Sequence, residues 1–180
     1  MTKEQEIALA APLSIEDIDF RVQSINKGGY ATILAYKDAR VDMKRLDEVL
    51  GVTGWQRDHK ELKGVIYSGV SVRDSDGFWL TKWDAGTESM AEGQKGEASD
   101  SFKRACFNLG IGRELYDYPL ISVKLYTDEF QIVGGKAKQT YNLKMKEWKW
   151  FVQHDGKKVS YLGAKDGKGK VRFQFGTIKK

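Results

Sequence analysis

The lysine–arginine pair Lys103-Arg104 stands in a segment whose apolar residues recur at helical spacing. We expect a helix from about Lys95 to Leu109, closed by Gly110, and its apolar stripe is Ala98, Phe102, Ala105, Cys106 and Leu109. The pair lies off this stripe together with Phe107, so an exposed aromatic ring is expected one turn from two cations. Cations contact phosphates and an aromatic face stacks on a base, which suits single-stranded nucleic acid. A solvated helix surface also carries such pairs, and the pair alone does not exclude it.

Four further cations are candidates for contact with the same polyanion. Arg40 and Lys44 are four residues apart in an expected helix from about Asp38 to Leu50, so they share a helix face. A charged solvent face balanced by neighbouring acids is an equally good interpretation of them. Lys82 lies on an expected strand, and Lys95 begins the segment of Lys103. Trp79 and Trp83 share the strand face opposite Lys82, and we expect that face to belong to the core.

An enzyme is the competing class of function. Glu61-Leu62-Lys63 has the acid-x-lysine spacing of a metal-dependent nuclease, with Asp47 or Asp42 as a possible second carboxylate for Mg²⁺. The spacing is short and frequent by chance, and Lys63-Gly64 fits a turn better. The run from Gly163 to Lys168 is one residue short of a phosphate-binding loop, so no nucleotide cofactor is expected. No metal site is expected either, because His59, His154 and Cys106 do not form a ligand cluster.

Charge is distributed unevenly along the 180 residues, which have a net charge of +5. Residues through Val133 have 17 basic and 22 acidic side chains, whereas the remainder has 13 basic and 3 acidic. A basic C-terminal third favours a polyanionic partner, although lysines also keep a surface soluble. The single cysteine excludes a disulfide framework within one chain. With no apolar run of membrane length and no signal-peptide pattern, we expect a soluble, cytoplasmic protein without membrane contact.

Patterning along the first 120 residues predicts helix, hairpin, helix, three-stranded meander and helix. The hairpin turns at Lys27-Gly28-Gly29, and the meander turns at Lys63-Gly64 and at Asp74-Ser75-Asp76-Gly77. Antiparallel strands covered by helices are an α+β arrangement with a β-β-β-α core. We therefore expect residues 1–120 to form the core domain.

Residues 121–180 are expected to be a basic extension of β-hairpins that belongs to the same domain. Strand-like segments separated by glycine-rich turns fill this region. They are residues 121–126, 130–133, 141–146, 148–154, 158–162 and 170–175. Lysines and aromatic residues alternate from Tyr141 to Phe151, as they do in nucleic-acid-binding strands and also along protected sheet edges.

Two segments resemble the Rad-fifty-two-type single-strand annealing protein family, whose members occur in eukaryotes and, in diverged form, in bacteriophages. KGEASDSFKRACFNLGIGRELYD, residues 95–117, is similar to the signature helix of that family. YKDARVDMKRLDEVLGVTGW, residues 36–55, is similar to its early helix, with a Gly-x-x-Gly-Trp exit. The meander stands between them in the expected order. The resemblance covers roughly residues 18–120, about one small domain, and a bacteriophage-like member is expected.

The resemblance implies a protein that forms a ring of identical subunits, binds single-stranded DNA and anneals complementary strands in recombination and repair. It implies no nucleotide cofactor and no catalytic residues. Lys103 and Arg104 match the lysine–arginine pair of the DNA groove, and Arg40 matches a groove arginine. Phe107 stands where the family usually has a third cation, so stacking would replace a charge there. A passive single-strand binder remains the alternative that the residues alone do not separate from an annealing protein.

Overall fold

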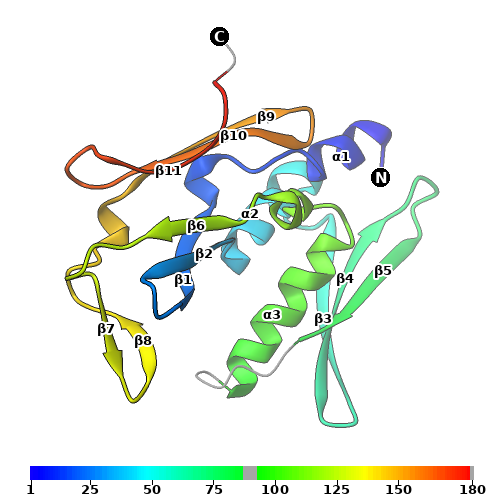
Figure 1. Cartoon of the computed structure of the whole chain (residues 1–180). Helices are drawn as coiled ribbons and strands as arrows, with labels where there is room; N and C mark the ends of the chain where they lie inside the picture. The colour runs from blue at the N-terminus through cyan, green and yellow to red at the C-terminus, as the bar shows by residue number, and fades with distance from the viewer. Residues whose placement is uncertain (87–92, 179–180) are drawn as a thin grey trace. The chain divides into compact units, whose positions relative to one another are not determined.

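The chain folds as an α+β protein of mostly antiparallel strands, which confirms the expected class (Figure 1). The computed structural model describes residues 1–86 and 93–178, without the side chains of residues 93–95. Its contacts divide the chain into two compact units. Unit 1 comprises residues 1–13 and 37–113, and unit 2 comprises residues 14–36 and 114–180. Unit 2 therefore includes the first hairpin as well as the residues that follow residue 113.

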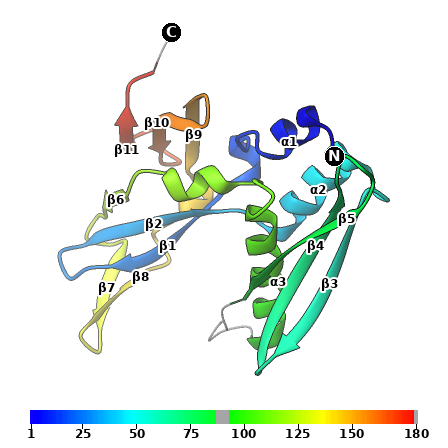
Figure 2. The same cartoon turned by 90° about the vertical axis from the view of Figure 1, so that its right-hand side faces the viewer.

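Unit 1 consists of a three-stranded sheet with helices on one side. Its elements are α1 (Lys3–Leu9), α2 (Ala39–Leu50), β3 (Trp55–Leu62), β4 (Val65–Arg73), β5 (Trp79–Ala85) and α3 (Gly93–Phe107). The strands form an antiparallel meander with β4 in the centre. Helix α3 runs along one face of this sheet (Figure 2). The expected β-β-β-α core is therefore present, in the expected order.

Short-range chemistry explains where the elements of unit 1 begin and turn. Asp38 caps α2 by accepting a hydrogen bond from the Arg40 amide, and Gly51 ends the helix at φ 79°. The β3–β4 turn has positive φ at both central residues, 53° at Lys63 and 77° at Gly64. Two such residues make the tight hairpin turn whose twist matches the flanking strands. The predicted turn is confirmed, and it fixes which β3 residues lie opposite β4.

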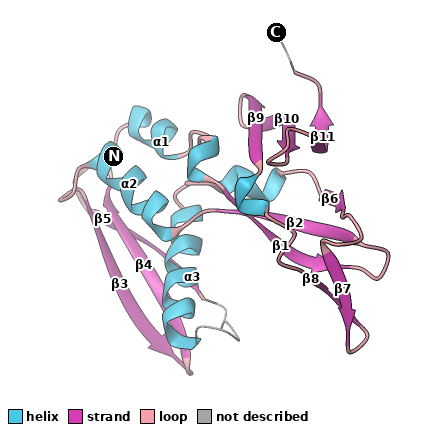
Figure 3. Cartoon of the chain, turned by 90° about the vertical axis from the view of Figure 1, so that its left-hand side faces the viewer, coloured by secondary structure: helices cyan, strands magenta, loops and turns pink. Residues whose placement is uncertain are grey.

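Unit 2 joins a hairpin from early in the chain to strands from its end (Figure 3). Its strands are β1 (Asp19–Ile25), β2 (Tyr30–Tyr36), β6 (Ile121–Lys124), β7 (Phe130–Val133), β8 (Lys136–Gln139), β9 (Lys149–Asp155), β10 (Lys158–Lys165) and β11 (Val171–Gly176). They form the sheets β1-β2-β6 and β11-β10-β9 and the pair β7-β8. Short 3-10 turns occupy Ile15–Asp17, Arg113–Asp117 and Met145–Glu147.

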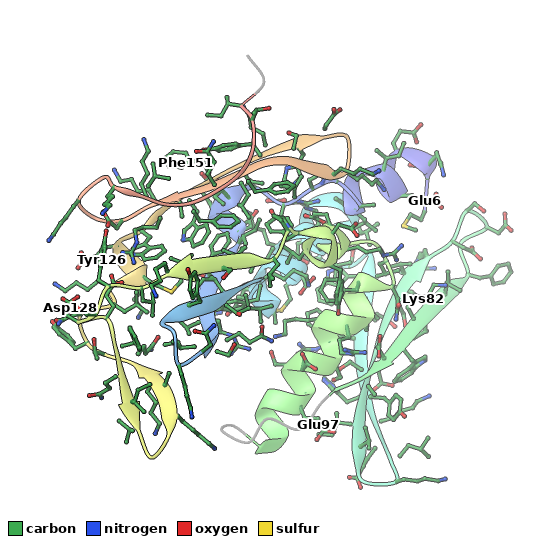
Figure 4. All side chains as sticks on the ribbon, viewed as in Figure 1. Glu6, Lys82, Glu97, Tyr126, Asp128 and Phe151 are labelled. Atoms are coloured by element: carbon green, nitrogen blue, oxygen red, sulfur yellow. The ribbon has the colours of Figure 1, made fainter. Side chains whose placement is uncertain are left out.

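Unit 2 has its own core and a buried charged network. Strands β2, β6 and β10 supply the core residues Ile33, Val123 and Leu162. At the edge of this core, the Arg172 guanidinium lies 2.6 Å from Glu129, with both side chains less than a tenth exposed. The same guanidinium lies over the rings of Tyr126, labelled in Figure 4, and Trp148. The network holds β11 to the segment after β6.

One expected strand, residues 141–146, is wrong, and one strand that was not expected, β8, precedes it. The segment after β8 is a turn in which the Thr140 hydroxyl donates to the Asp128 carbonyl at 2.5 Å. The Asn142 side chain donates to the same carbonyl, and its amide donates to the Thr140 hydroxyl. Local side-chain bonds of this kind compete with strand pairing, which explains the difference. Among the described helices, none has the length and apolarity that crossing a bilayer requires.

Candidate nucleic-acid interface

Helix α3 packs on the sheet through the stripe that the sequence predicts. Phe102, Ala105 and Cys106 are fully buried. Near the start of the helix, Glu97 is also buried, and its carboxylate accepts the Ile66 amide of β4 at 2.8 Å. Glu97, labelled in Figure 4, thus has a structural partner on the sheet. These contacts set which side of α3 remains open to solvent.

Lys103 and Arg104 lie along the two borders of the open side of α3 and have different surroundings. The Arg104 side chain is 41% exposed and lies 3.3 Å from the Asp84 carboxylate of β5. The Asn108 amide group donates to the same carboxylate at 3.3 Å. Lys103 makes no salt bridge with any described residue, and it lies close enough to Asp42 of α2 for their charges to interact. Lys103 is therefore the less neutralised cation of the pair.

A buried ion pair between Lys37 and Asp42 lies beside Lys103. Both side chains are almost inaccessible to solvent. Burial raises the pKa of the Asp42 carboxyl to about 6, against the opposing effect of Lys37, and burial lowers the pKa of Lys37. The Lys37 ammonium also lies 4.5 Å from the centre of the Phe107 ring. Phe107 was expected to be exposed, but it is half-buried and a cation covers one of its faces.

The cations of α2 lie on different sides of that helix. Asp42 and Leu46 are buried, and helical spacing places Arg40 and Lys44 on the opposite, solvent-facing side. The Arg40 side chain is 87% exposed. The structure therefore keeps Arg40 and Lys44 together, but on another side of α2 from the one that faces Lys103. Arg45 has a structural role, because its guanidinium donates to the carbonyls of Ala8 and Ala11.

The sheet adds cations on the face that α3 covers. Lys82 of β5, labelled in Figure 4, lies opposite Val70 of β4 and is exposed. Arg57 of β3 lies opposite the same Val70 from the other side, and its guanidinium is 5.0 Å from the Phe102 ring centre. Arg57 is not among the residues predicted from the sequence to contact DNA. Its spacing of two from Trp55, whose ring stacks near Phe102, was the available signal. The Lys95 side chain lies outside the described residues.

The face that carries Trp79 and Trp83 is the one away from α3, so the expectation that these tryptophans belong to the core is wrong. Trp79 is 38% exposed, and the Arg73 guanidinium lies 4.5 Å from its ring centre. The Trp83 ring lies over Gly69, where a Cβ atom would come within 2.7 Å of it. The Lys60 ammonium lies 4.1 Å from the same ring. Alternation correctly placed the two rings on one face, but the helix covers the other.

The residues of the nuclease alternative do not converge. Glu61 is exposed near the end of β3, and Lys63 is in the turn that follows. Asp42 is paired with Lys37, and Asp47 accepts the Trp55 indole N–H at 2.7 Å. Among the described residues, no group of three or more His, Cys, Asp or Glu side chains could hold a metal ion. Both proposed carboxylate partners of Glu61 are thus engaged with other residues.

Comparison with known proteins places this geometry in a wider context. Residues 62–129 match the model of the Rad52/22 family double-strand break repair protein. The chain is also 32% identical over 114 residues to the single-stranded DNA-binding protein DdrA of Deinococcus radiodurans. That alignment covers 62% of this chain and 54% of the relative, so the chain spans about half the length of the curated protein that it matches.

The matched segment begins where β3 ends and includes β4, β5, α3 and β6. It therefore contains Lys82 and the pair Lys103-Arg104, whereas Arg40, Lys44 and the strands from β7 onward lie outside it. The resemblance expected from the α3 segment is confirmed. Residues 62–129 of this chain are therefore similar to the Rad52/22 family of double-strand break repair proteins.

Proposed function

We propose that the protein binds single-stranded DNA without sequence preference and anneals complementary strands in recombination and repair. In this proposal it acts as an oligomeric ring and needs no ATP. The observation that carries the proposal is the position of Lys103 and Arg104 on the open side of α3, inside the matched segment. The relative named a single-stranded DNA-binding protein supports the same ligand.

The surroundings of the pair favour phosphate as the group that is bound. Lys103, Arg104 and Lys82 are cations, and cations contact the phosphates of a DNA strand. Contacts to phosphate carry no sequence information. A surface of this kind neutralises repulsion between two strands and leaves base edges free to pair. In a ring, many weak sites would act on one strand and give high avidity. Arg40 and Lys44 extend the proposed track only if DNA also reaches the solvent-facing side of α2.

The proposal is tested by the double substitution Lys103→Ala/Arg104→Ala. Removing two phosphate contacts should reduce the slope of log affinity against log salt by about 1.4 for single-stranded DNA. Fluorescence anisotropy with a labelled oligonucleotide, across a salt series, measures both affinity and slope. The matched control Lys3→Ala/Lys63→Asn removes two cations elsewhere in unit 1, and asparagine tolerates the positive φ of residue 63. Equal slopes for both variants would exclude α3 as the phosphate site.

Annealing is separated from passive binding by following duplex formation between two labelled complementary oligonucleotides. The protein should accelerate duplex formation even when EDTA is present and ATP is absent. Binding without acceleration would favour the passive single-strand binder. Mg²⁺-dependent cleavage that Glu61→Ala removes would favour the nuclease. Mass measurement in solution, with and without an oligonucleotide, tests the ring, because a monomer that anneals at full rate contradicts it. The resemblance to bacteriophage members of the family remains a prediction.

A further inference from the structure

The sheet β9-β10-β11 in unit 2 has one face turned to the core and one turned outward. Trp150 and Leu162 point to the core, where the Trp150 ring stacks on Phe20 at 3.7 Å and Leu162 is fully buried. Side chains alternate along a strand, so the residues between them point outward. The outward residues of β9 and β10 include Lys149, Phe151, Gln153, Tyr161, Gly163 and Lys165, and Asp155 follows Gln153 on the same side at the end of β9.

Two aromatic rings lie next to each other on the outward face. Phe151, labelled in Figure 4, is 46% exposed and lies directly across from Gly163. A Cβ atom on Gly163 would come within 2.5 Å of the Tyr161 hydroxyl oxygen and 2.9 Å of its Cζ. The Tyr161 ring therefore leans along β10 over the glycine and does not stand upright from the sheet. Gly163 thus permits a flat ring beside Phe151, which is the form of a stacking surface.

Two lysines stand beside these rings without an acidic partner. Lys149 of β9 lies directly opposite Lys165 of β10, on the same face as Phe151. Like charges in this position destabilise a sheet unless an anion lies between them. Neither lysine forms a salt bridge with any described residue. Along the strands, Lys149 is two residues from Phe151, and Lys165 is two residues from Gly163, over which the Tyr161 ring leans. Two residues of a strand span about 7 Å. This spacing lets one nucleotide stack on a ring and place its phosphate near a lysine.

A groove of about 350 Å³ borders the same rings. Phe151, Gln153, Tyr161 and Lys165 are among its lining residues, and every lining residue belongs to unit 2. Its walls therefore combine apolar rings with an amide and a cation, and none of them is acidic. The region from Gly134 onward, with 13 basic and 3 acidic residues, gives the sheet a positive setting. Rings and cations on this face, together with a groove whose lining residues include no acid, favour a nucleic-acid strand over a protein surface.

We propose that this outward face is a second binding surface for single-stranded nucleic acid, at which bases stack on Phe151 and Tyr161 while Lys149 and Lys165 contact the flanking phosphates. This inference rests on the proposed function, because it assumes the same ligand. The surface belongs to unit 2 and lies outside residues 62–129, whereas α3 belongs to unit 1. It holds bases by their faces, whereas the α3 site holds phosphates.

The two sites predict different salt dependence, which is the basis of the test. In the full chain, Phe151→Leu/Tyr161→Leu keeps apolar bulk but removes both rings. We expect affinity for a labelled oligonucleotide to fall at least about fivefold with an unchanged salt slope, because stacking releases no counterions. Phe151→Trp/Tyr161→Phe should retain wild-type affinity. Tyr141→Ala removes a ring that is 88% exposed elsewhere in unit 2 and serves as the control.

Photo-cross-linking to an oligonucleotide that contains iodouracil locates the contact directly. Cross-linked peptides should include Phe151 or Tyr161, and the leucine variant should lose them while cross-links to the α3 segment persist. If the leucine variant binds like wild type and cross-links map only to α3, the second surface is overturned and the proposed function stands. If the wild-type protein does not bind single-stranded DNA at all, both are overturned. An affinity loss that Tyr141→Ala reproduces also overturns the second surface.

Discussion

At the scale of single residues, Lys103 and Arg104 differ in how much of their charge is available to DNA. Sequence neighbours with the same charge would be expected to contribute equally. In the structure, Arg104 shares the Asp84 carboxylate with Asn108, whereas Lys103 makes no salt bridge with a described residue. One of the two cations of the proposed phosphate site is thus already paired with an acidic residue of the same protein. Removing the Asp84 carboxylate should make Arg104 more available to a phosphate.

Asp84→Asn is therefore expected to strengthen single-strand binding. The substitution removes the partner of Arg104 and a negative charge near Lys82, and a gain of up to about fivefold corresponds to a half-exposed ion pair. Anisotropy titration at fixed salt measures the change. Asp58→Asn, on the sheet face away from α3, removes the same charge and should change affinity little. An equal gain in both variants would indicate a general effect of net charge and contradict a specific role for Arg104.

Asp42 is expected to titrate far from an ordinary aspartate. Burial raises its pKa from 3.8 to about 6, so between these values the folded protein holds a proton that the unfolded chain has lost. The stabilisation from this proton is complete below pH 3.8 and disappears as the pH rises through 6. A ¹³C NMR titration of aspartate carboxyl carbons should show one midpoint near pH 6 that Asp42→Asn removes. A spectrum without it would show that the pair stays ionised throughout.

At the scale of elements, the sheets β3-β4-β5 and β9-β10-β11 each have one face that is covered and one that is open. Helix α3 covers the β3-β4-β5 face that carries Val70, and the tryptophan face remains open.

In unit 2, the outer strand β11 is held by the Arg172 network. Removing one partner of a buried ion pair of this kind is costly, because the charge of the other partner is left without compensation.

Arg172→Met is expected to destabilise unit 2 by about 3 kcal/mol or more. Glu129 and Asp166 would lose their shared partner, and the Tyr126 and Trp148 rings would lose the cation between them. Arg172→Lys should cost less, since it keeps a charge but not the two-pronged contact with Glu129. Urea denaturation followed by circular dichroism measures the losses. Arg21→Met, at an exposed arginine, is the control, and a similar midpoint for it and Arg172→Met would contradict the importance of the network.

At the scale of the whole molecule, the two units depend differently on the C-terminal third of the chain. The buried core of unit 1 contains Leu9, Leu46, Phe102 and Ile111, all of which precede residue 120. Of the nine buried residues described in the main core cluster of unit 2, Ala31 and Ile33 precede it and the other seven follow it. The hairpin β1-β2 therefore packs against residues that come about a hundred positions later.

A chain ending at residue 120 should consequently keep unit 1 folded and lose the β1-β2 hairpin. Hydrogen exchange with mass spectrometry should show protection retained in Val65–Arg73 and Gly93–Phe107 but lost in Asp19–Tyr36. Protection surviving in the hairpin would mean that β6 and the later strands are not its core. The oligomer mass of the same truncated chain tells whether assembly requires unit 2.

Much of the local structure follows from the sequence alone. Spacing of apolar residues predicted α2, α3 and the buried stripe of α3, because a helix has one repeat and only one of its sides fits the sheet. The Lys63-Gly64 pair predicted the β3-β4 turn, because glycine adopts positive φ at little cost. The resemblance to the annealing family required two segments in order, residues 36–55 and residues 95–117, because the lysine–arginine pair alone was ambiguous. The turn after β8 was missed, because Thr140 and Asn142 use side chains to compete with strand pairing.

Long-range packing decided what the pattern could not. Alternation placed Trp79 and Trp83 on one face, but which face a helix covers depends on residues far away in the chain. The burial of Lys37 depends on Asp42 and Phe107, and the platform of Phe151 and Tyr161 depends on strands meeting in one register at Gly163. Periodicity is a property of neighbours along the chain, so it determines which residues share a side. Only the folded chain determines whether that side meets protein or solvent.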